Sequence, residues 1–181
     1  LYQDGPVTQG HGSPWISSSG TSGSAIVTNN SLELIDSRSE DVRISLSPAI
    51  FTNHTSAFFS FHLIVRELPS KGGTYFALLL KGNASPIKLF VSTTNAISNH
   101  FRLSLSVTSG SDILEKELVT DLPLQTKTRV VLQYNLSEGK IRLWQGNETE
   151  KPDELCELVV EGNPVFTHFG FRQNTGIGSL E

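Results

Sequence analysis

Alternation of apolar and polar residues is the strongest pattern in this sequence, and it is clearest over residues 100–108. In this stretch (HFRLSLSVT), apolar side chains occupy every second position from Phe101 to Val107, and polar side chains fill the positions between them. A period of two places all the apolar side chains on one face of a β-strand. A sheet that buries one face and wets the other is normally antiparallel. The pattern therefore predicts an antiparallel strand whose apolar face meets a core and whose polar face meets water.

Further strands are predicted wherever this alternation, or a short apolar run bounded by turn residues, recurs along the chain. They cover residues 25–28, 31–36, 41–46, 56–67, 74–80, 87–92, 113–119, 127–134, 140–145, 155–160 and 165–172. Turn-prone pairs such as Asn29-Asn30 separate them. Five N-x-S/T sequences also fall in predicted turns and indicate surface loops, at Asn29, Asn53, Asn83, Asn135 and Asn147.

About a dozen short strands, with no amphipathic helix of useful length, predict an all-β fold. We expect one domain over residues 1–181, an antiparallel two-sheet β-sandwich of the jelly-roll type. Residues 1–24 are rich in Gly, Ser, Pro and Thr, show no period, and are expected to form an ordered N-terminal arm or loop anchored by Tyr2 and Trp15. The predicted core collects apolar residues of the alternating strands: Phe59, Phe61, Leu63, Phe101, Leu103, Leu105, Val130, Leu132, Ile141 and Leu143.

Composition and charge exclude several classes of function. Fourteen basic and eighteen acidic residues give a formal charge of −4, with no block of like charge, whereas a nucleic-acid-binding surface needs a basic stripe. No segment approaches the roughly 18 apolar residues of a membrane span. The single cysteine, Cys156, excludes an intrachain disulfide and lies in a strand-like run, where a buried, unreactive thiol is expected. The sequence begins at Leu1 without Met, which a signal peptide or tag removed before that residue would explain.

Stretches near both ends of the chain resemble a known family. DGPVTQGHGSPW (4–15), SGTSG (19–23) and SLELIDSRSEDVRISL (31–46) resemble the N-terminal half of laminin-G-like, concanavalin A-like jelly-roll modules of large secreted or surface bacterial proteins. FTHFGFRQNTGIGSLE (166–181) resembles their penultimate strand and the start of the last one. The resemblance implies a concanavalin A-like sandwich, a secreted or cell-surface location, and a carbohydrate-binding-type module. The fold itself also hosts hydrolases, lyases and spacers.

The resemblance also suggests a metal. Concanavalin A-like sandwiches often hold a structural calcium ion between their first and last strands, through Asp and backbone carbonyl oxygens. Asp4 is the acidic residue of the N-terminal arm, so the resemblance makes it the candidate calcium ligand. The five histidines are scattered along the sequence, and no transition-metal site is expected from their spacing.

Residues of a catalytic site do not form a pattern in this sequence. Glycoside hydrolysis needs two carboxyl groups in one groove, about 5–10 Å apart. Glu115 and Glu117 share one face of a predicted strand, but Lys116 between them and the neighbouring hairpin indicate a solvated edge. A polysaccharide lyase would need a Tyr/His or Lys/Arg set in a groove, and such residues are also common on the polar faces of ordinary sheets. We therefore expect a module without catalytic activity.

The polar faces of the predicted strands carry the candidate ligand-binding residues. Arg142 and Trp144 alternate with Ile141 and Leu143, so they should point away from the core. An exposed Trp beside an Arg can stack against a sugar ring and hydrogen-bond to it. The alternative is that Trp144 packs beneath the charged segment 148–154, where a short helical turn is expected. The candidate residues for binding a polysaccharide or glycan are Trp144, Arg142, Tyr75, His62, Arg66, His100 and Arg102.

The sheet edges leave a second function open. Family members continue past this point with a strand that pairs with the first strand, whereas the last segment here, 176–181, looks too short to cover its neighbour. An open edge can accept a strand from another chain, and the arm 1–24 could supply one. The alternative function is therefore a structural or adhesive surface module that assembles into a homo-oligomer through strand or arm exchange.

Overall fold

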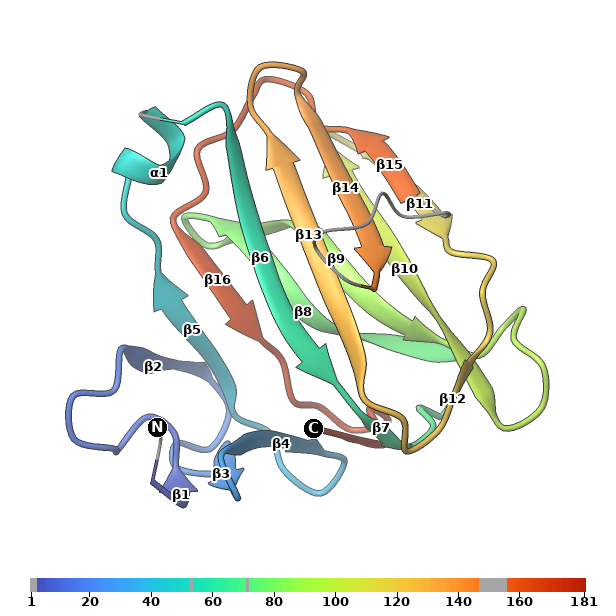
Figure 1. Cartoon of the computed structure of the whole chain (residues 1–181). Coiled ribbons are helices and arrows are strands. Elements are labelled where there is room, and N and C mark those ends of the chain that lie inside the picture. Colours follow the sequence, from blue (N-terminus) through green and yellow to red (C-terminus); the bar gives the residue numbers. More distant parts are fainter. Residues whose placement is uncertain (1–2, 53, 71, 147–155) are drawn as a thin grey trace.

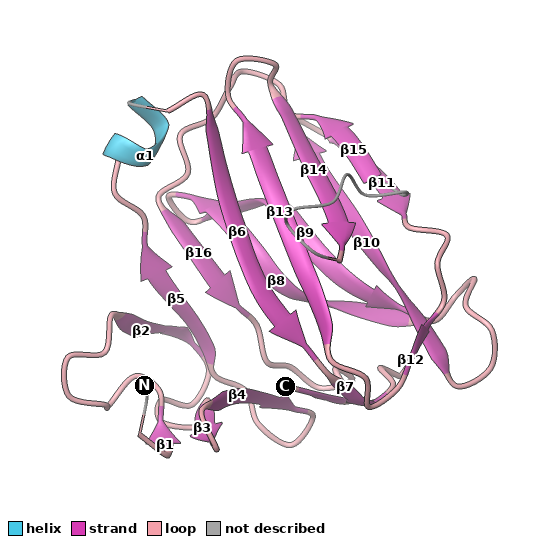
Figure 2. Cartoon of the chain, in the orientation of Figure 1, coloured by secondary structure: helices cyan, strands magenta, loops and turns pink. Residues whose placement is uncertain are grey.

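Three antiparallel sheets make up the computed structural model, which describes residues 3–52, 54–70, 72–146 and 156–181 (Figure 1). Two sheets face each other, and the third lies across one end of the sandwich. Regular structure is almost entirely β-strand (Figure 2), and the described residues contain a single short helix, α1 (Ala49–Thr52). None of the described helical structure is long and apolar enough to cross a membrane. The predicted all-β, antiparallel sandwich is confirmed.

The largest sheet, which we call the large sheet, follows the strand order β11-β10-β9-β8-β16-β5-β2. Its strands are β2 (Trp15–Ser19), β5 (Asp41–Ser45), β8 (Gly73–Lys81), β9 (Ala84–Ser92), β10 (His100–Ser109), β11 (Asp112–Glu117) and β16 (His168–Phe171). A two-residue strand, β12 (Leu122–Pro123), pairs with the start of β10.

The opposing four-stranded sheet follows the order β15-β14-β13-β6. It contains β6 (Ser56–Leu63), β13 (Thr128–Asn135), β14 (Lys140–Gln145) and β15 (Cys156–Val159). The third sheet, which we call the N-terminal sheet, follows the order β1-β3-β4-β17-β7. It contains β1 (Gly5–Pro6), β3 (Ile26–Thr28), β4 (Ser31–Ile35), β7 (Val65–Glu67) and β17 (Ser179–Leu180).

The core fills the space between the apolar faces of the two main sheets. All ten predicted core residues belong to it or pack against it, and Leu103 and Leu132 are completely buried. Phe59 and Phe61 are partly buried and pack on aromatic rings of the opposite sheet, with Phe59 stacked on Phe169 at 5.3 Å between ring centroids. Full burial of such a side chain stabilises the fold by roughly 1.5–3 kcal/mol, so the alternation seen in the sequence accounts for most of the sandwich.

The polar face of β10 departs from the expectation that it is wet. Ser104 and Ser106 point away from the core, yet they are only 0% and 3% exposed. Each small serine lies between longer side chains of the neighbouring strands, since Ser104 is opposite Phe90 on β9. Ser104 Oγ also donates to Glu115 Oε1 of β11 at 3.1 Å. A short side chain in the middle of a sheet is covered by its neighbours whichever face it is on.

The first 24 residues form more structure than the predicted loop. Residues 15–19 pair with β5 as strand β2, and β1 pairs with β3. Trp15 anchors this region as expected, with its ring centroid 5.6 Å from that of Phe171. Tyr2, the other predicted anchor, lies outside the described residues. Buried Glu40 fixes the next turn, because its Oε2 accepts a hydrogen bond from the Ala25 amide at 2.8 Å. The arm therefore folds back onto its own sandwich.

The long strand predicted over 56–67 divides into two at Ile64. The Ile64 amide donates to the Glu181 carbonyl at 2.7 Å, and the Glu181 amide donates to the Ile64 carbonyl at 2.8 Å. Before this point β6 belongs to the four-stranded sheet, and after it β7 belongs to the N-terminal sheet. The segment that looked too short to cover its neighbour lies between two strands, because Ser179 and Leu180 pair with β4 on one side and β7 on the other.

The Asn29-Asn30 turn forms as predicted. Both residues have positive φ (51° and 65°), as a two-residue hairpin turn between β3 and β4 requires. Of the other N-x-S/T sites, Asn83 is exposed, whereas Asn135 is buried and its Oδ1 accepts a hydrogen bond from Ser137 Oγ at 2.8 Å. Asn53, Asn147 and the charged segment 148–154 lie outside the described residues.

Candidate functional site

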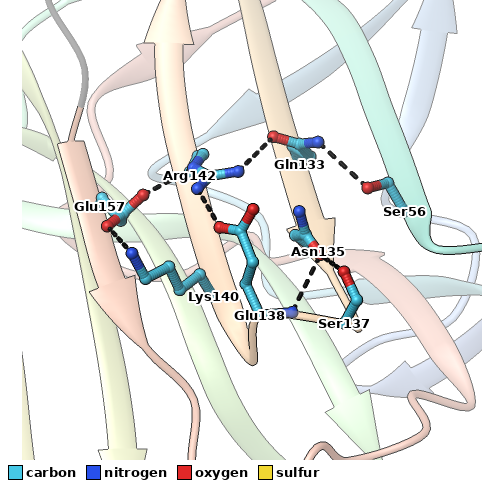
Figure 3. A network of polar contacts seen from close by, with 8 residues as sticks. All are labelled: Ser56, Gln133, Asn135, Ser137, Glu138, Lys140, Arg142 and Glu157. Carbon is cyan, nitrogen blue, oxygen red and sulfur yellow. Dashed lines mark hydrogen bonds and ion pairs between the residues drawn. The ribbon is translucent and has the colours of Figure 1, made fainter.

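A polar network covers part of the outer face of the four-stranded sheet (Figure 3). Arg142 lies at its centre on β14, between Glu157 of β15 and Gln133 of β13. Its Nε donates to Glu157 Oε2 at 2.6 Å, one terminal nitrogen donates to Glu138, and the other lies 3.4 Å from Gln133 Oε1. Lys140 Nζ adds an ion pair with Glu157 Oε1 at 2.7 Å.

These hydrogen bonds and ion pairs compensate the positive charge of Arg142. The hydrogen bond to Glu157 raises the pKa of the Arg142 guanidinium, and the hydrogen bonds from Lys140 and Arg142 hold the pKa of Glu157 below its ordinary value. A guanidinium with its fork occupied by two carboxylates has little capacity left for a ligand. Arg142, a candidate ligand-binding residue, therefore acts as a link between three strands.

Trp144 and His62 lie on the same outer face as Arg142. Trp144 is half-buried opposite Val131, while exposed His62 is opposite Arg129. Partial burial lowers the pKa of His62, and the nearby cations Lys127 and Arg129 lower it further, so the imidazole is neutral over more of the pH range than an ordinary histidine. The segment that Trp144 was alternatively predicted to pack beneath, 148–154, lies outside the described residues.

His100 and Arg102 lie on the outer face of the large sheet, at the start of β10. Arg102 Nε donates to Asp121 Oδ1 at 2.7 Å, and its NH1 lies 3.6 Å from Glu117 Oε2. The hydrogen bond with Asp121 raises the pKa of Arg102 and lowers that of Asp121. His100 Nδ1 lies 2.9 Å from the Ser98 carbonyl oxygen. Arg102, like Arg142, is compensated by carboxylates of its own chain.

Arg66 is on a third surface, the N-terminal sheet. It lies on β7 and forms an ion pair with Glu181 through Nε and a terminal nitrogen. The seven candidates are thus distributed over three surfaces. His62, Arg142 and Trp144 share one face, Tyr75, His100 and Arg102 share another, and Arg66 lies apart from both.

Tyr75 has different surroundings from the other candidates. It lies on β8, on the outer face of the large sheet, and its ring contacts Phe90 of β9 edge-on at 5.7 Å between centroids. Two cations approach the same ring: Arg172 Cζ is 4.2 Å and Lys88 Nζ is 5.0 Å from its centroid. Within the described part of the chain, neither cation has a carboxylate partner.

A hollow of about 280 Å³ opens beside Tyr75 on this face. Arg43 of β5 and Arg172 line it together with Tyr75. Other lining residues supply hydroxyl, amide, carboxylate and apolar groups: Ser18, Ser19, Asp41, Asn83, Ser85, Leu78 and Leu80. Asp41 is engaged within the chain, since its Oδ1 accepts from the Gln173 amide at 3.1 Å and its Oδ2 from Ser19 Oγ at 2.7 Å.

Gly170 has no side chain, so the backbone itself forms the floor of the hollow at this position. It lies on β16 between Arg43 of β5 and Leu78 of β8, facing outward. A Cβ at this position would lie 2.9 Å from the Val42 carbonyl oxygen and 3.4 Å from Arg43 Cβ. Arg43, Lys88, Gly170 and Arg172 were not among the sequence-based candidates. Alternation placed Arg43 and Lys88 on polar faces, but only the pairing of β5, β16, β8 and β9 shows that they are neighbours.

A second, larger cavity of about 460 Å³ lies where the N-terminal sheet meets the core. Its wall is mostly aromatic and aliphatic, with Trp15, Phe61, Phe76 and Phe171 among the lining residues. Polar side chains also line this cavity: Asn30, Ser31, His62, Lys127 and Glu181. The hollow beside Tyr75 is smaller but is the better candidate site, because Arg43 and Arg172, which line it, form no ion pair within the described part of the chain, whereas Glu181 is paired with Arg66.

Asp4, the predicted calcium ligand, is not part of a cluster of metal-binding side chains among the described residues. Asp4 is exposed and its Oδ1 accepts a hydrogen bond from the Asn29 amide at 2.9 Å. Across residues 3–52, 54–70, 72–146 and 156–181, no three His, Cys, Asp or Glu side chains gather as a metal site would require. The described residues around Asp4 thus fit a turn-stabilising carboxylate better than a calcium site.

No protein-family model and no curated protein matches this sequence. Solved structures match its fold. A Ca²⁺/Man-bound form of the VIP36 exoplasmic/lumenal domain is 16% identical with a TM-score of 0.61, over 93% of this chain and 82% of that chain. The CBM2 module of Lactobacillus casei BL23 phage J-1 evolved Dit is 10% identical with a TM-score of 0.62, over 99% and 93% of the two chains.

An alginate lyase from Alteromonas sp.272 is similar at 11% identity and a TM-score of 0.55, over 90% of this chain and 75% of that chain. At these identities the likeness concerns the fold. Lectin domain, carbohydrate-binding module and lyase share one architecture, and the chain described above has it as well: a concanavalin A-like β-sandwich.

Proposed function

We propose that this chain is a non-catalytic carbohydrate-binding module of the laminin-G-like type, acting outside the cell, with its glycan site in the hollow beside Tyr75. The fold supports the carbohydrate-binding part, because similar structures include a mannose-bound lectin domain and a CBM2 module. The exoplasmic/lumenal domain among them and the family resemblance of residues 4–46 support the extracellular setting.

One observation carries the choice of site: the hollow combines open volume with binding groups that the chain itself leaves free. Sugar-binding sites pair a small apolar or aromatic surface with a few well-placed polar groups. Here Leu78 and Leu80 supply apolar surface, while hydroxyls and amides at the rim can hydrogen-bond to sugar hydroxyls. The guanidinium groups of Arg102 and Arg142, in contrast, are occupied by carboxylates.

Among the described residues, the hollow has no pair of carboxylates, and this supports a binding role over hydrolysis. Asp41 is the only acidic residue among the described lining residues, and both its oxygens accept hydrogen bonds from the chain. Glycoside hydrolysis needs two carboxyl groups at the scissile bond. His168, on the same face, lies opposite Leu80 and one outward position along β16 from Gly170, so it is farther from the Tyr75 ring than Arg172 is.

Calcium binding by Asp4 is a secondary proposal. Its support is the Ca²⁺-bound form of the VIP36 domain and the resemblance that singled out Asp4. If Asp4 holds calcium, the ion should raise the thermal unfolding midpoint of the wild type and leave that of Asp4→Asn unchanged. An equal response of the two proteins would remove Asp4 as the ligand.

Arm exchange finds less support than glycan binding. The proposed donor, residues 1–24, pairs with β5 and β3 of the same chain, and the segment at 179–180 has partners on both sides. A homo-oligomer through this arm would have to break those pairings first. Sedimentation of the wild type over a wide concentration range would reveal such an assembly.

Affinity electrophoresis on a panel of neutral and acidic polysaccharides tests the proposed function. We expect the wild type to be retarded by at least one polysaccharide, Tyr75→Ala to be retarded less, and Trp144→Ala to behave as the wild type. The reverse ranking would move the site to the four-stranded sheet. Retardation by none would refute the proposal, and release of unsaturated uronate, read by its ultraviolet absorbance, would refute its non-catalytic part.

A further inference from the structure

We infer that the hollow binds an acidic polysaccharide, whose carboxylate or sulfate groups are held by Arg43 and Arg172, which line it, and by Lys88 beside it on the same face. This inference rests on the proposed function and specifies its ligand class. Three independent features carry it: the register that brings these cations together, the lack of carboxylate partners for them, and the sugar-compatible surface between them.

The strand register places two of the cations in one row across the large sheet. Arg43, Gly170, Leu78 and Lys88 are successive partners on β5, β16, β8 and β9, all on the outer face. At about 4.8 Å per strand, the Cα atoms of the two cations are roughly 14 Å apart. Gly170 and Leu78 leave a low floor between them, so a ligand lying across the strands would meet a cation at each end.

The third cation sits beside this row on the same face. Arg172 lies over the Tyr75 ring at 4.2 Å, and Lys88 lies 5.0 Å from the same ring centroid. Their charged groups are therefore no more than about 9 Å apart, which is within the Debye length of about 10 Å in 0.1 M salt, so their mutual repulsion is not screened away. Cation–π contacts hold the two groups in position without neutralising them.

No described carboxylate lies within ion-pair distance of these cations. Arg43, Lys88 and Arg172 form no ion pair within the described part of the chain, and Asp41, which lines the hollow, is engaged by Gln173 and Ser19. Arg43 Nε is buried and without a hydrogen-bond partner. Unpaired buried donors are rare in folded proteins, and an arginine fork matches a carboxylate or sulfate oxygen pair. An anionic ligand in the hollow could pair with such a fork.

The width of the site indicates a polymer. Cations spread over four strands exceed the reach of one small anion, and the hydroxyl and amide groups at the rim suit the hydroxyls of a sugar chain. Three cations around one hollow do not form the continuous basic stripe on which nucleic-acid affinity depends. Tyr75 acts here as a positioning residue, because its ring supports Lys88 and Arg172.

Affinity electrophoresis in gels containing polygalacturonate, dextran sulfate, dextran or polyglutamate tests this inference. We expect the wild type to be retarded by polygalacturonate or dextran sulfate, and the stronger of the two identifies carboxylate or sulfate as the bound group. Loss of two charge-assisted hydrogen bonds in Lys88→Gln/Arg172→Gln should weaken this binding at least about tenfold. Lys127→Gln removes one exposed positive charge at the start of β13 and should bind as the wild type. Tyr75→Phe, which keeps the ring, should retain affinity that Tyr75→Ala loses.

Each of the other outcomes would overturn a specific part of the inference. Retardation by dextran alone would overturn the acidic ligand and leave the proposed function intact, and retardation by no polysaccharide would overturn both. Equal retardation by polyglutamate would show that any polyanion binds. Unchanged affinity of the double variant, or an equal loss in Lys127→Gln, would remove the site from this hollow. An unaltered thermal unfolding midpoint establishes that the double variant is folded.

Discussion

On the outer face of the four-stranded sheet, Arg142 has Glu157 and Glu138 as hydrogen-bond acceptors. On the outer face of the large sheet, Arg172 lies over the Tyr75 ring and has no carboxylate partner among the residues that the structure describes. Arg142 lies within β14, and Arg172 directly follows the last residue of β16. The first face uses its cation to join strands. The second leaves several cations uncompensated around a hollow, and uncompensated charge raises the free energy of the unliganded protein. The difference indicates that a ligand completes the second face.

The largest expected effect tests the premise that both faces rest on one core. Leu103 of the large sheet and Leu132 of the four-stranded sheet are fully buried between them. Leu103→Ala and Leu132→Ala should each lower the free energy of unfolding by about 2–5 kcal/mol, measured by urea denaturation. Arg102→Ala, on the outer side of the same strand as Leu103, should cost much less. A large difference between the two leucine variants would mean that the sheets do not share one cooperative core.

The comparison itself is tested by neutralising one cation on each face. Arg142→Gln leaves Glu138 without its hydrogen-bond donor and Glu157 with only Lys140, and should cost about 1–2 kcal/mol of unfolding free energy. Lys88→Gln removes a charge that has no ion-pair partner among the described residues, so stability should change by less than about 0.5 kcal/mol. Urea denaturation of both variants in low salt measures the two changes in unfolding free energy. Equal losses would erase the distinction between the two faces.

A smaller expected effect is the loss of unfolding free energy at low pH. Lys140 and Arg142 hold the pKa of Glu157 below its ordinary value of 4.5, so this carboxylate contributes stability that is fully present above that pH. The contribution is lost as the pH falls through the lowered pKa of the folded state. Between about pH 6 and pH 3, the wild type should therefore lose more unfolding free energy than Glu157→Gln. Parallel profiles for the two proteins would show that the network carries no pH-dependent stability.

The smallest expected effect reports on the charge of the hollow directly. Burial lowers the pKa of His168, and the nearby Arg43 cation lowers it further. Arg43→Gln should raise that pKa, as followed by NMR titration of the imidazole. His62 is the internal control, because its neighbouring cations are Lys127 and Arg129. An unchanged His168 titration would mean that the Arg43 charge is already compensated.

The fold was predictable because its signal is local. Alternation over 100–108 or 140–145 sorts inward from outward positions without knowledge of any partner strand. What alternation cannot supply is which outward positions are neighbours, since that depends on register between strands far apart in the sequence. Arg43 and Lys88 lie in one row only because β16, from the end of the chain, separates β5 from β8.

Side-chain length set a second limit on the prediction. Ser104 looked solvent-exposed from its polarity, yet longer neighbours cover it. Arg142 looked available for a ligand because it points outward, but its partners come from a loop and from the adjacent strand β15. In both positions the sequence indicated the correct face, and the surroundings on that face determined exposure and availability.

The insertion of β16 and β17 among early strands bears on how the protein is made. Residues 168–171 complete the large sheet between β5 and β8, and Gln173 Oε1 accepts a hydrogen bond from the Ile35 amide, 138 positions earlier in the chain. During synthesis, therefore, β16 cannot complete the hollow until almost the whole of this sequence has emerged from the ribosome. Pairing over such sequence distances makes folding slow, and a nascent chain paused before residue 168 should show neither ligand binding nor cooperative unfolding in pulse proteolysis.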